Sequence, residues 1–136
     1  MPKKWKPPKI KHGKPTKWGW VVYYPKNLTL GRNVDIGCFT FIHAGFGVVI
    51  EDGVQIGGGC HIYSASTIDE KAGAVWLKKG CKIGANSVIM PGVTVGEGAV
   101  VGAMSFVPAY TEIPAGEVWA GCPVRRVKER KVGKNL

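Results

Sequence analysis

Residues 77–113 read LKKGCKIGANSVIMPGVTVGEGAVVGAMSFVPAYTEI, and an aliphatic side chain stands at every sixth position of this stretch. The series is Leu77, Ile83, Ile89, Val95, Val101, Val107 and Ile113. A period of six fits neither an α-helix, whose apolar face repeats about every 3.6 residues, nor a long strand, whose faces alternate every two residues. The stretch therefore predicts very short strands joined by sharp corners.

The same spacing extends upstream, through Leu30, Ile36 and Ile42 and then through Ile50, Ile56 and Ile62. Its phase slips only after Ile42 and after Ile62. Three short strands close a triangular coil of about 18 residues, and successive coils stack at the ~4.8 Å spacing of paired strands. We therefore expect an all-β solenoid of about five coils, with Cys60 and Cys81 as small buried side chains beside the aliphatic core.

Stacking the coils in register predicts three columns of inward side chains. They are Leu30, Ile50, Leu77, Val95 and Ile113 on one face, Ile36, Ile56, Ile83, Val101 and Trp119 on the second, and Ile42, Ile62, Ile89 and Val107 on the third. Both phase slips follow the third face. The connections around residues 43–49 and 64–75 should therefore emerge at the same edge, where insertions in a solenoid often build a binding site.

The chain has 136 residues, enough for one compact domain, and 20 of them are glycines. We expect an N-terminal arm over residues 1–27, a solenoid domain over residues 28–124 and a tail over residues 125–136. Five prolines before residue 28 argue against a helix in the arm, whereas the segment 124–131 is expected to form one or two helical turns. No apolar run is long enough for a membrane span, and the Lys-rich start lacks the apolar run of a secretory signal, so we expect a cytoplasmic protein.

The formal net charge of +10 resides in the two ends of the chain. Residues 1–17 contain seven lysines and no acid, and residues 125–136 contain six basic residues and one acid, whereas the intervening part is slightly acidic. Basic tails attract any polyanion, so they are weak evidence for nucleic acid, which we do not expect as the partner. The aromatic side chains of the arm are expected to cap the open end of the solenoid, and stacking on bases is the open alternative. They are Trp5, Trp18, Trp20, Tyr23 and Tyr24.

Three segments resemble motifs of the hexapeptide-repeat acyltransferases. They are IGANSVIMPGVTVG at residues 83–96, VGAMSFV at residues 101–107 and AGCPVR at residues 120–125. The resemblance covers residues 28–124 and implies a left-handed parallel β-helix, acetyl-CoA as acyl donor, a sugar or nucleotide sugar as acceptor, and a homotrimer with its sites between subunits. It also implies that the pantetheine lies beside Ala85 and Ala103, and that Arg125 and Lys128 lie near the phosphates.

Two histidines, His43 and His61, flank aliphatic positions of the third face, so both side chains should point outward near the edge that carries the insertions. Transfer of an acetyl group to a hydroxyl or amine needs a base with a pKa near 7, which imidazole provides. We therefore expect His43, His61 or both to be catalytic, with a structural role as the alternative. In galactoside and maltose acetyltransferases, which this sequence resembles, the position that corresponds to Thr67 holds the catalytic His.

The loop at this edge contains Ser64, Ser66, Thr67 and Asp69, which we expect to bind the acceptor; Asp69 is also a candidate base. The cysteines show no zinc-site spacing, so we expect no metal site. Two other functions stay open. One is an inactive scaffold or polyanion-binding module, and the other is a metal lyase similar to γ-class carbonic anhydrase, which would need a third ligand besides the two histidines.

Overall fold

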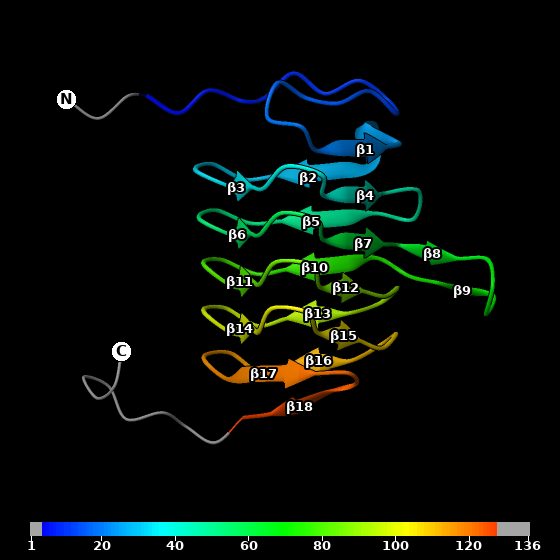
Figure 1. Ribbon diagram of the computed structural model, residues 1–136. Coiled ribbons are helices and arrows are strands. Elements are labelled where there is room, and N and C mark those ends of the chain that lie inside the picture. Colours follow the sequence, from blue (N-terminus) through cyan, green and yellow to red (C-terminus); the bar gives the residue numbers. More distant parts are fainter. Residues whose placement is uncertain (1–3, 128–136) are drawn as a thin grey trace.

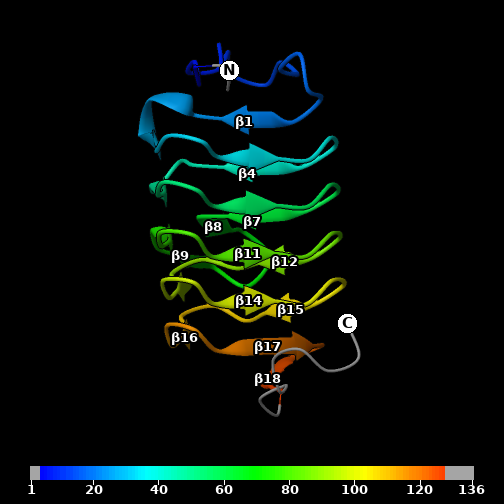
Figure 2. The same cartoon turned by 90° about the vertical axis from the view of Figure 1, so that its left-hand side faces the viewer.

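The computed structural model describes residues 4–127, which form a β-solenoid of about five turns with three faces of stacked strands (Figures 1 and 2). The first sheet has the order β1 (Val21–Tyr23), β4 (Phe41–His43), β7 (His61–Tyr63), β12 (Val88–Ile89) and β15 (Phe106–Val107). The second has the order β2 (Leu28–Leu30), β5 (Val48–Ile50), β10 (Val75–Leu77), β13 (Thr94–Val95) and β16 (Glu112–Ile113). The third has the order β3 (Asp35–Ile36), β6 (Gln55–Ile56), β11 (Lys82–Ile83), β14 (Val100–Val101), β17 (Val118–Gly121) and β18 (Val124–Arg126).

The strand register confirms the three predicted columns. In the second sheet Leu30 pairs with Ile50, and the pairing continues in parallel to Ile113. In the third sheet the column from Ile36 ends with Val101 opposite Trp119. Because each coil places its aliphatic side chain directly under that of the previous coil, the core is one continuous apolar column.

Small side chains fill the remaining space of the core. Cys60 and Cys81 are completely buried, as predicted, and Thr40, Ser87 and Ser105 occupy equivalent places. Burial raises the pKa of the Cys60 thiol, and burial together with the nearby Glu51 carboxylate raises that of Cys81 to about 12. Both thiols therefore stay protonated at neutral pH.

The first sheet begins inside the segment that we expected to be irregular. Val22 in β1 pairs with Ile42 and is fully buried. The Thr16 N–H donates to the Trp20 carbonyl at 2.9 Å, and the indole of Trp20 is buried in the core cluster, against which Ile10 also packs. The arm thus covers one end of the apolar column, as expected.

The other end is turned back by a strand. β18 pairs with β17 in antiparallel fashion, so the helical turn predicted from residue 124 onward is wrong for the part that the structure describes. Between residues 4 and 127 the helical content is a three-residue 3-10 turn, Pro25–Asn27, and no helix there is long and apolar enough to cross a membrane.

Candidate active site

Both insertions emerge at one edge, as predicted, where the chain passes from the first sheet to the second. We call this the hairpin edge, because the second insertion forms an antiparallel hairpin of β8 (Ala65–Ser66) and β9 (Lys71–Ala72) that projects from the solenoid (Figure 1). The first insertion is the connection between β4 and β5, and it begins directly after His43. The hairpin and His43 therefore lie on adjacent coils.

The half-buried ring of His43 is held by its own loop. The Gly45 N–H donates to His43 Nδ1 at 3.3 Å, and the ring of Tyr24 lies edge-on with centroids 5.3 Å apart. A nitrogen that accepts a hydrogen bond carries the lone pair, so we assign the proton of the neutral ring to Nε2. His43 is thus arranged to donate a hydrogen bond through Nε2.

Ser64 fixes the loop that carries His43. Its hydroxyl donates to the His43 carbonyl at 2.7 Å and accepts the Phe46 N–H at 3.0 Å, and its side chain is completely buried. The hydroxyl proton is used within the chain and the side chain is covered. Ser64 is therefore placed to position His43, not to contact an acceptor as we expected from the sequence.

His61 lies on the same outward face but not at the same place along the strands. It begins β7, opposite Phe41, whereas His43 ends β4 opposite Tyr63. The rings of His61 and Tyr63 stack with centroids 6.0 Å apart, and within residues 4–127 neither ring nitrogen of His61 has a hydrogen-bond partner. The two histidines therefore offer different chemistry: His43 is engaged through Nδ1, and His61 has both nitrogens free of the chain.

The hairpin turn holds the remaining polar candidates. The Ser66 hydroxyl donates to the Asp69 carboxylate, and Lys71 Nζ lies 3.9 Å from the same group. The Ser66 hydrogen bond and then the charge of Lys71 hold the pKa of Asp69 below its ordinary value, so this carboxylate is a weak base at neutral pH. Thr67 is exposed, and Ile68 at the tip is 97% exposed.

Tyr110, which the sequence did not single out, anchors the base of the hairpin. Its hydroxyl donates to the Ala72 carbonyl at 3.0 Å, and its ring packs on Gly92, where a Cβ atom would overlap the ring. The repeat phase was the available signal, because Tyr110 stands three residues after Val107 just as Gly92 stands three residues after Ile89.

The opposite end of the first-sheet strands carries a second column, which we call the small-residue edge. Gly58, Ala85 and Ala103 lie one above the other there, because the Asn86 N–H donates to the Gly58 carbonyl at 3.0 Å and the Met104 N–H donates to the Ala85 carbonyl at 2.8 Å. Side chains this small leave the backbone open to a thin ligand. The structure thus brings Ala85 and Ala103 together, as the resemblance implied.

Arg125 lies at the foot of this column. It pairs with Ala120 across β17 and β18, and a Cβ atom on Gly102 would lie 2.8 Å from Ala120 Cβ. The neighbouring Arg126 is engaged, with Nε 3.7 Å from Glu117, whereas Arg125 is exposed and forms no salt bridge within residues 4–127. Lys128 lies outside the described residues.

Metal ligands are not grouped in this part of the chain. Between residues 4 and 127, no three His, Cys, Asp or Glu side chains lie close enough together to hold an ion. The four cysteines are free thiols, with Cys38 and Cys122 exposed.

Comparison with known proteins gives the same architecture with acyl-transfer activities. The family described as bacterial transferase hexapeptide (six repeats) matches residues 74–109. The putative colanic acid biosynthesis acetyltransferase WcaF of Escherichia coli is 30% identical over 115 residues, which are 80% of this chain and 62% of that protein. The chain spans between 30% and 62% of the length of the first curated relatives that it matches.

Two solved structures are similar over most of the chain. AntD, an N-acyltransferase from Bacillus cereus in complex with dTDP-4-amino-4,6-dideoxyglucose and coenzyme A, is 28% identical with a TM-score of 0.68, covering 85% of this chain and 80% of that one. A hexapeptide-repeat acetyltransferase from Vibrio cholerae complexed with acetyl coenzyme A is 26% identical with a TM-score of 0.74, covering 82% and 65%. Because its repeat, its register and its relatives agree, the chain belongs to the hexapeptide-repeat transferase family of β-solenoids, whose homologous members are acyl- and acetyltransferases.

Proposed function

We propose that the protein transfers an acetyl group from acetyl-CoA to a hydroxyl or amine of a sugar or nucleotide sugar. The observation that carries this proposal is the small-residue edge, where Ala85 and Ala103 stack in register above the exposed Arg125. Small side chains admit the pantetheine arm, and a guanidinium can bind a phosphate through two parallel hydrogen bonds. The relatives whose structures contain coenzyme A or acetyl coenzyme A support this choice of donor.

We assign the two histidines different roles. The donor supplies an activated thioester carbonyl, which the acceptor oxygen or nitrogen attacks as the bond to the CoA sulfur breaks. His61, with both ring nitrogens unengaged, takes the proton that the acceptor loses and returns it to the departing thiolate. His43, which carries its proton on Nε2, donates a hydrogen bond that orients the acceptor.

The hairpin provides the acceptor with polar contacts. Thr67 exposes a hydroxyl, and Asp69 with Ser66 presents a charged, hydrogen-bonded pair suited to sugar hydroxyls. Since Ser64 is buried, its part is to keep the His43 loop in place. The dTDP-sugar bound to AntD supports a nucleotide sugar as one class of acceptor to test.

The two halves of this site lie on different edges of one chain, which favours a homotrimer. The small-residue edge and the hairpin edge are at opposite ends of the first-sheet strands. Three copies around an axis would bring the small-residue edge of one subunit against the hairpin edge of the next. Each complete site would then need two subunits.

The proposal is tested by calorimetric titration of the protein with acetyl-CoA at near-physiological salt. Saturable binding at about one site per chain is expected, together with a solution mass of three chains. Acetyl-CoA consumption is then followed with sugars and nucleotide sugars as acceptors. A folded protein that binds no acetyl-CoA would contradict the proposal and favour the inactive scaffold.

A further inference from the structure

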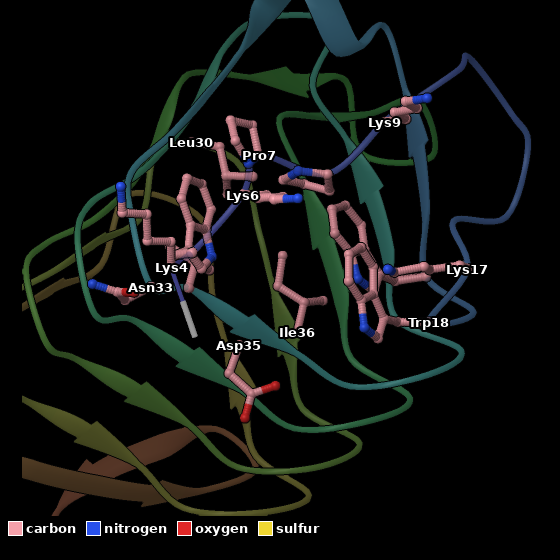
Figure 3. Close-up of a pocket in the computed structure, with 14 residues that line it drawn as sticks. Lys4, Lys6, Pro7, Lys9, Lys17, Trp18, Leu30, Asn33, Asp35 and Ile36 are labelled. Carbon is pink, nitrogen blue, oxygen red and sulfur yellow. The ribbon is translucent and has the colours of Figure 1, made fainter. Parts of the chain in front are cut away.

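A cavity of about 1240 Å³ opens at the N-terminal end of the solenoid, far from the β17–β18 hairpin (Figures 1 and 3). It lies between the arm and the first coil. Its lining comes from residues 4–9, from residues 17, 18 and 20, and from residues 30 and 33–36. The cavity shares no residue with the hairpin edge or the small-residue edge, so it is separate from the candidate active site.

The lining is strongly cationic. It contains Lys4, Lys6, Lys9 and Lys17, against the single carboxylate of Asp35. All four lysines are exposed, and none of them forms a salt bridge with another described residue. Their ammonium groups are therefore available to an anion.

Aromatic faces accompany these charges. Trp18 is 47% exposed, Lys17 Nζ lies 4.6 Å from the centroid of its ring, and Trp5 on the arm is half-buried. Figure 3 shows Lys4 and Asn33 on one side of the cavity and Lys17 and Trp18 on the other, with Ile36 between them. An indole face next to an ammonium group suits a ligand that carries a flat ring next to a phosphate.

The chemistry of the lining favours a nucleic acid strand over a carbohydrate. Sugar hydroxyls need acceptors as well as donors, but among the side chains of the lining only Asn33 and Asp35 accept hydrogen bonds. The bases of a strand need mainly a flat apolar face, and its phosphates need cations. The exposed Lys11 and Lys14 continue the positive charge along the arm beyond the cavity, which fits a chain of phosphates better than a single nucleotide. We propose that this cavity binds a short segment of single-stranded nucleic acid, with bases stacked on Trp5 and Trp18 and phosphates on the lysines.

This site is independent of the acetyltransferase site, and the two can be tested separately. The probe is a fluorescein-labelled 12-nucleotide dT strand, whose binding to the full chain is followed by anisotropy between 50 and 200 mM salt. If the four lysines each neutralise one phosphate, the affinity should fall by about 50-fold over this range. A duplex of the same length and free dTTP should bind at least 10-fold more weakly.

Two pairs of matched variants separate the cavity from general charge and general aromatic content. Replacing Lys4, Lys6 and Lys9 by glutamine should weaken strand binding by at least 10-fold and reduce the slope of log K against log salt by about two. Replacing the exposed Lys26, Lys79 and Lys82, which lie outside the cavity, by glutamine makes the same change in net charge and should alter the affinity by less than threefold.

For the aromatic contact, Trp18→Ala should weaken strand binding by about 10-fold, with the slope unchanged. Trp76→Ala removes an indole of similar exposure on the second sheet and should leave binding unchanged. Circular dichroism checks that all variants fold. No binding, equal losses in both lysine triples, equal binding of dTTP, or displacement of the strand by acetyl-CoA would each overturn the proposal.

Discussion

The hydroxyl of Ser64 joins two points of the loop that follows His43: it donates to the His43 carbonyl at 2.7 Å and accepts the Phe46 N–H at 3.0 Å. One buried side chain thus holds the connection that begins with a candidate catalytic residue. Its contribution to the proposed reaction would be made through His43, without contact to the acceptor.

Ser64→Ala should therefore affect stability and turnover together. The Phe46 N–H loses its partner in a partly buried place, so the free energy of unfolding should fall by about 1–3 kcal/mol. The KM for the acceptor should rise while the affinity for acetyl-CoA stays the same, as measured by urea unfolding, steady-state kinetics and calorimetry. Ser66→Ala, on the exposed hairpin, is the control that should leave stability within about 0.5 kcal/mol. An unchanged acceptor KM in Ser64→Ala would remove the positioning role.

The two histidines should separate in kinetics. His61→Ala should lower kcat by about 10²–10⁴-fold, as expected for loss of a general base, with acetyl-CoA affinity retained. His43→Ala should mainly raise the acceptor KM, and His43→Gln, which keeps a donor, should recover part of the loss. Full activity in both alanine variants would contradict the catalytic assignment.

Arg125 and Arg126 differ in their partners, so they should differ in ligand binding. Arg125→Ala should weaken CoA binding by about 10-fold, because a charge-assisted contact to phosphate is lost. Arg126→Ala should have little effect on CoA, since its guanidinium lies against Glu117. Calorimetry with dephospho-CoA locates the contact: a smaller loss than with CoA indicates the terminal phosphate, and equal losses would place Arg125 elsewhere.

The hairpin anchor can be tested with two glycines of similar backbone conformation. Gly92 has φ +74° and Gly98 has φ +69°, but a Cβ atom on Gly92 would overlap the Tyr110 ring, whereas one on Gly98 would meet nothing within 4 Å. Gly98→Ala should cost about 1–2 kcal/mol for its backbone conformation alone. Gly92→Ala should cost more and should also increase cleavage of the β8–β9 hairpin by protease. Equal costs and equal cleavage would show that Tyr110 does not anchor the hairpin.

The buried thiol of Cys81 should make stability depend on pH in the alkaline range. Below pH 9.0 the thiol is protonated in both states, whereas between pH 9.0 and about 12 only the unfolded chain loses the proton. The free energy of unfolding should therefore fall by about 1.4 kcal/mol per pH unit within this window. Urea unfolding at several pH values measures the fall, and Cys81→Ala should flatten it. Parallel curves for the two proteins would contradict the assignment.

Much of the fold could be predicted because the solenoid is a local, repeated pattern. The spacing from Leu77 to Ile113 determined the three inward columns, and every predicted pair of those columns is present in the strand register. The repeat does not extend to its own ends. Val22 joins the first sheet from a proline-rich arm, and Val124 enters an antiparallel strand, because tertiary pairing with an existing sheet edge decides both segments.

The candidate site was less accessible to sequence reasoning. The common edge of the two insertions followed from the phase slips, but the burial of Ser64 and the engagement of His43 Nδ1 depend on how one loop folds over the next coil. The contact of Tyr110 with Ala72 joins residues 38 positions apart, and no spacing rule connects them. Side-chain partners across coils are set by loop geometry, which hydrophobic periodicity does not encode.

The parallel stacking of identical coils also fixes a length. In the third sheet four steps separate β3, beside the cationic cavity, from β17, beside Arg125, and each step is about 4.8 Å, so the two ends stand about 19 Å apart. Adding or removing one coil would change this separation by a single step and leave both ends intact. The solenoid therefore acts as a ruler, in which the number of repeats sets how far apart two chemically distinct termini are held.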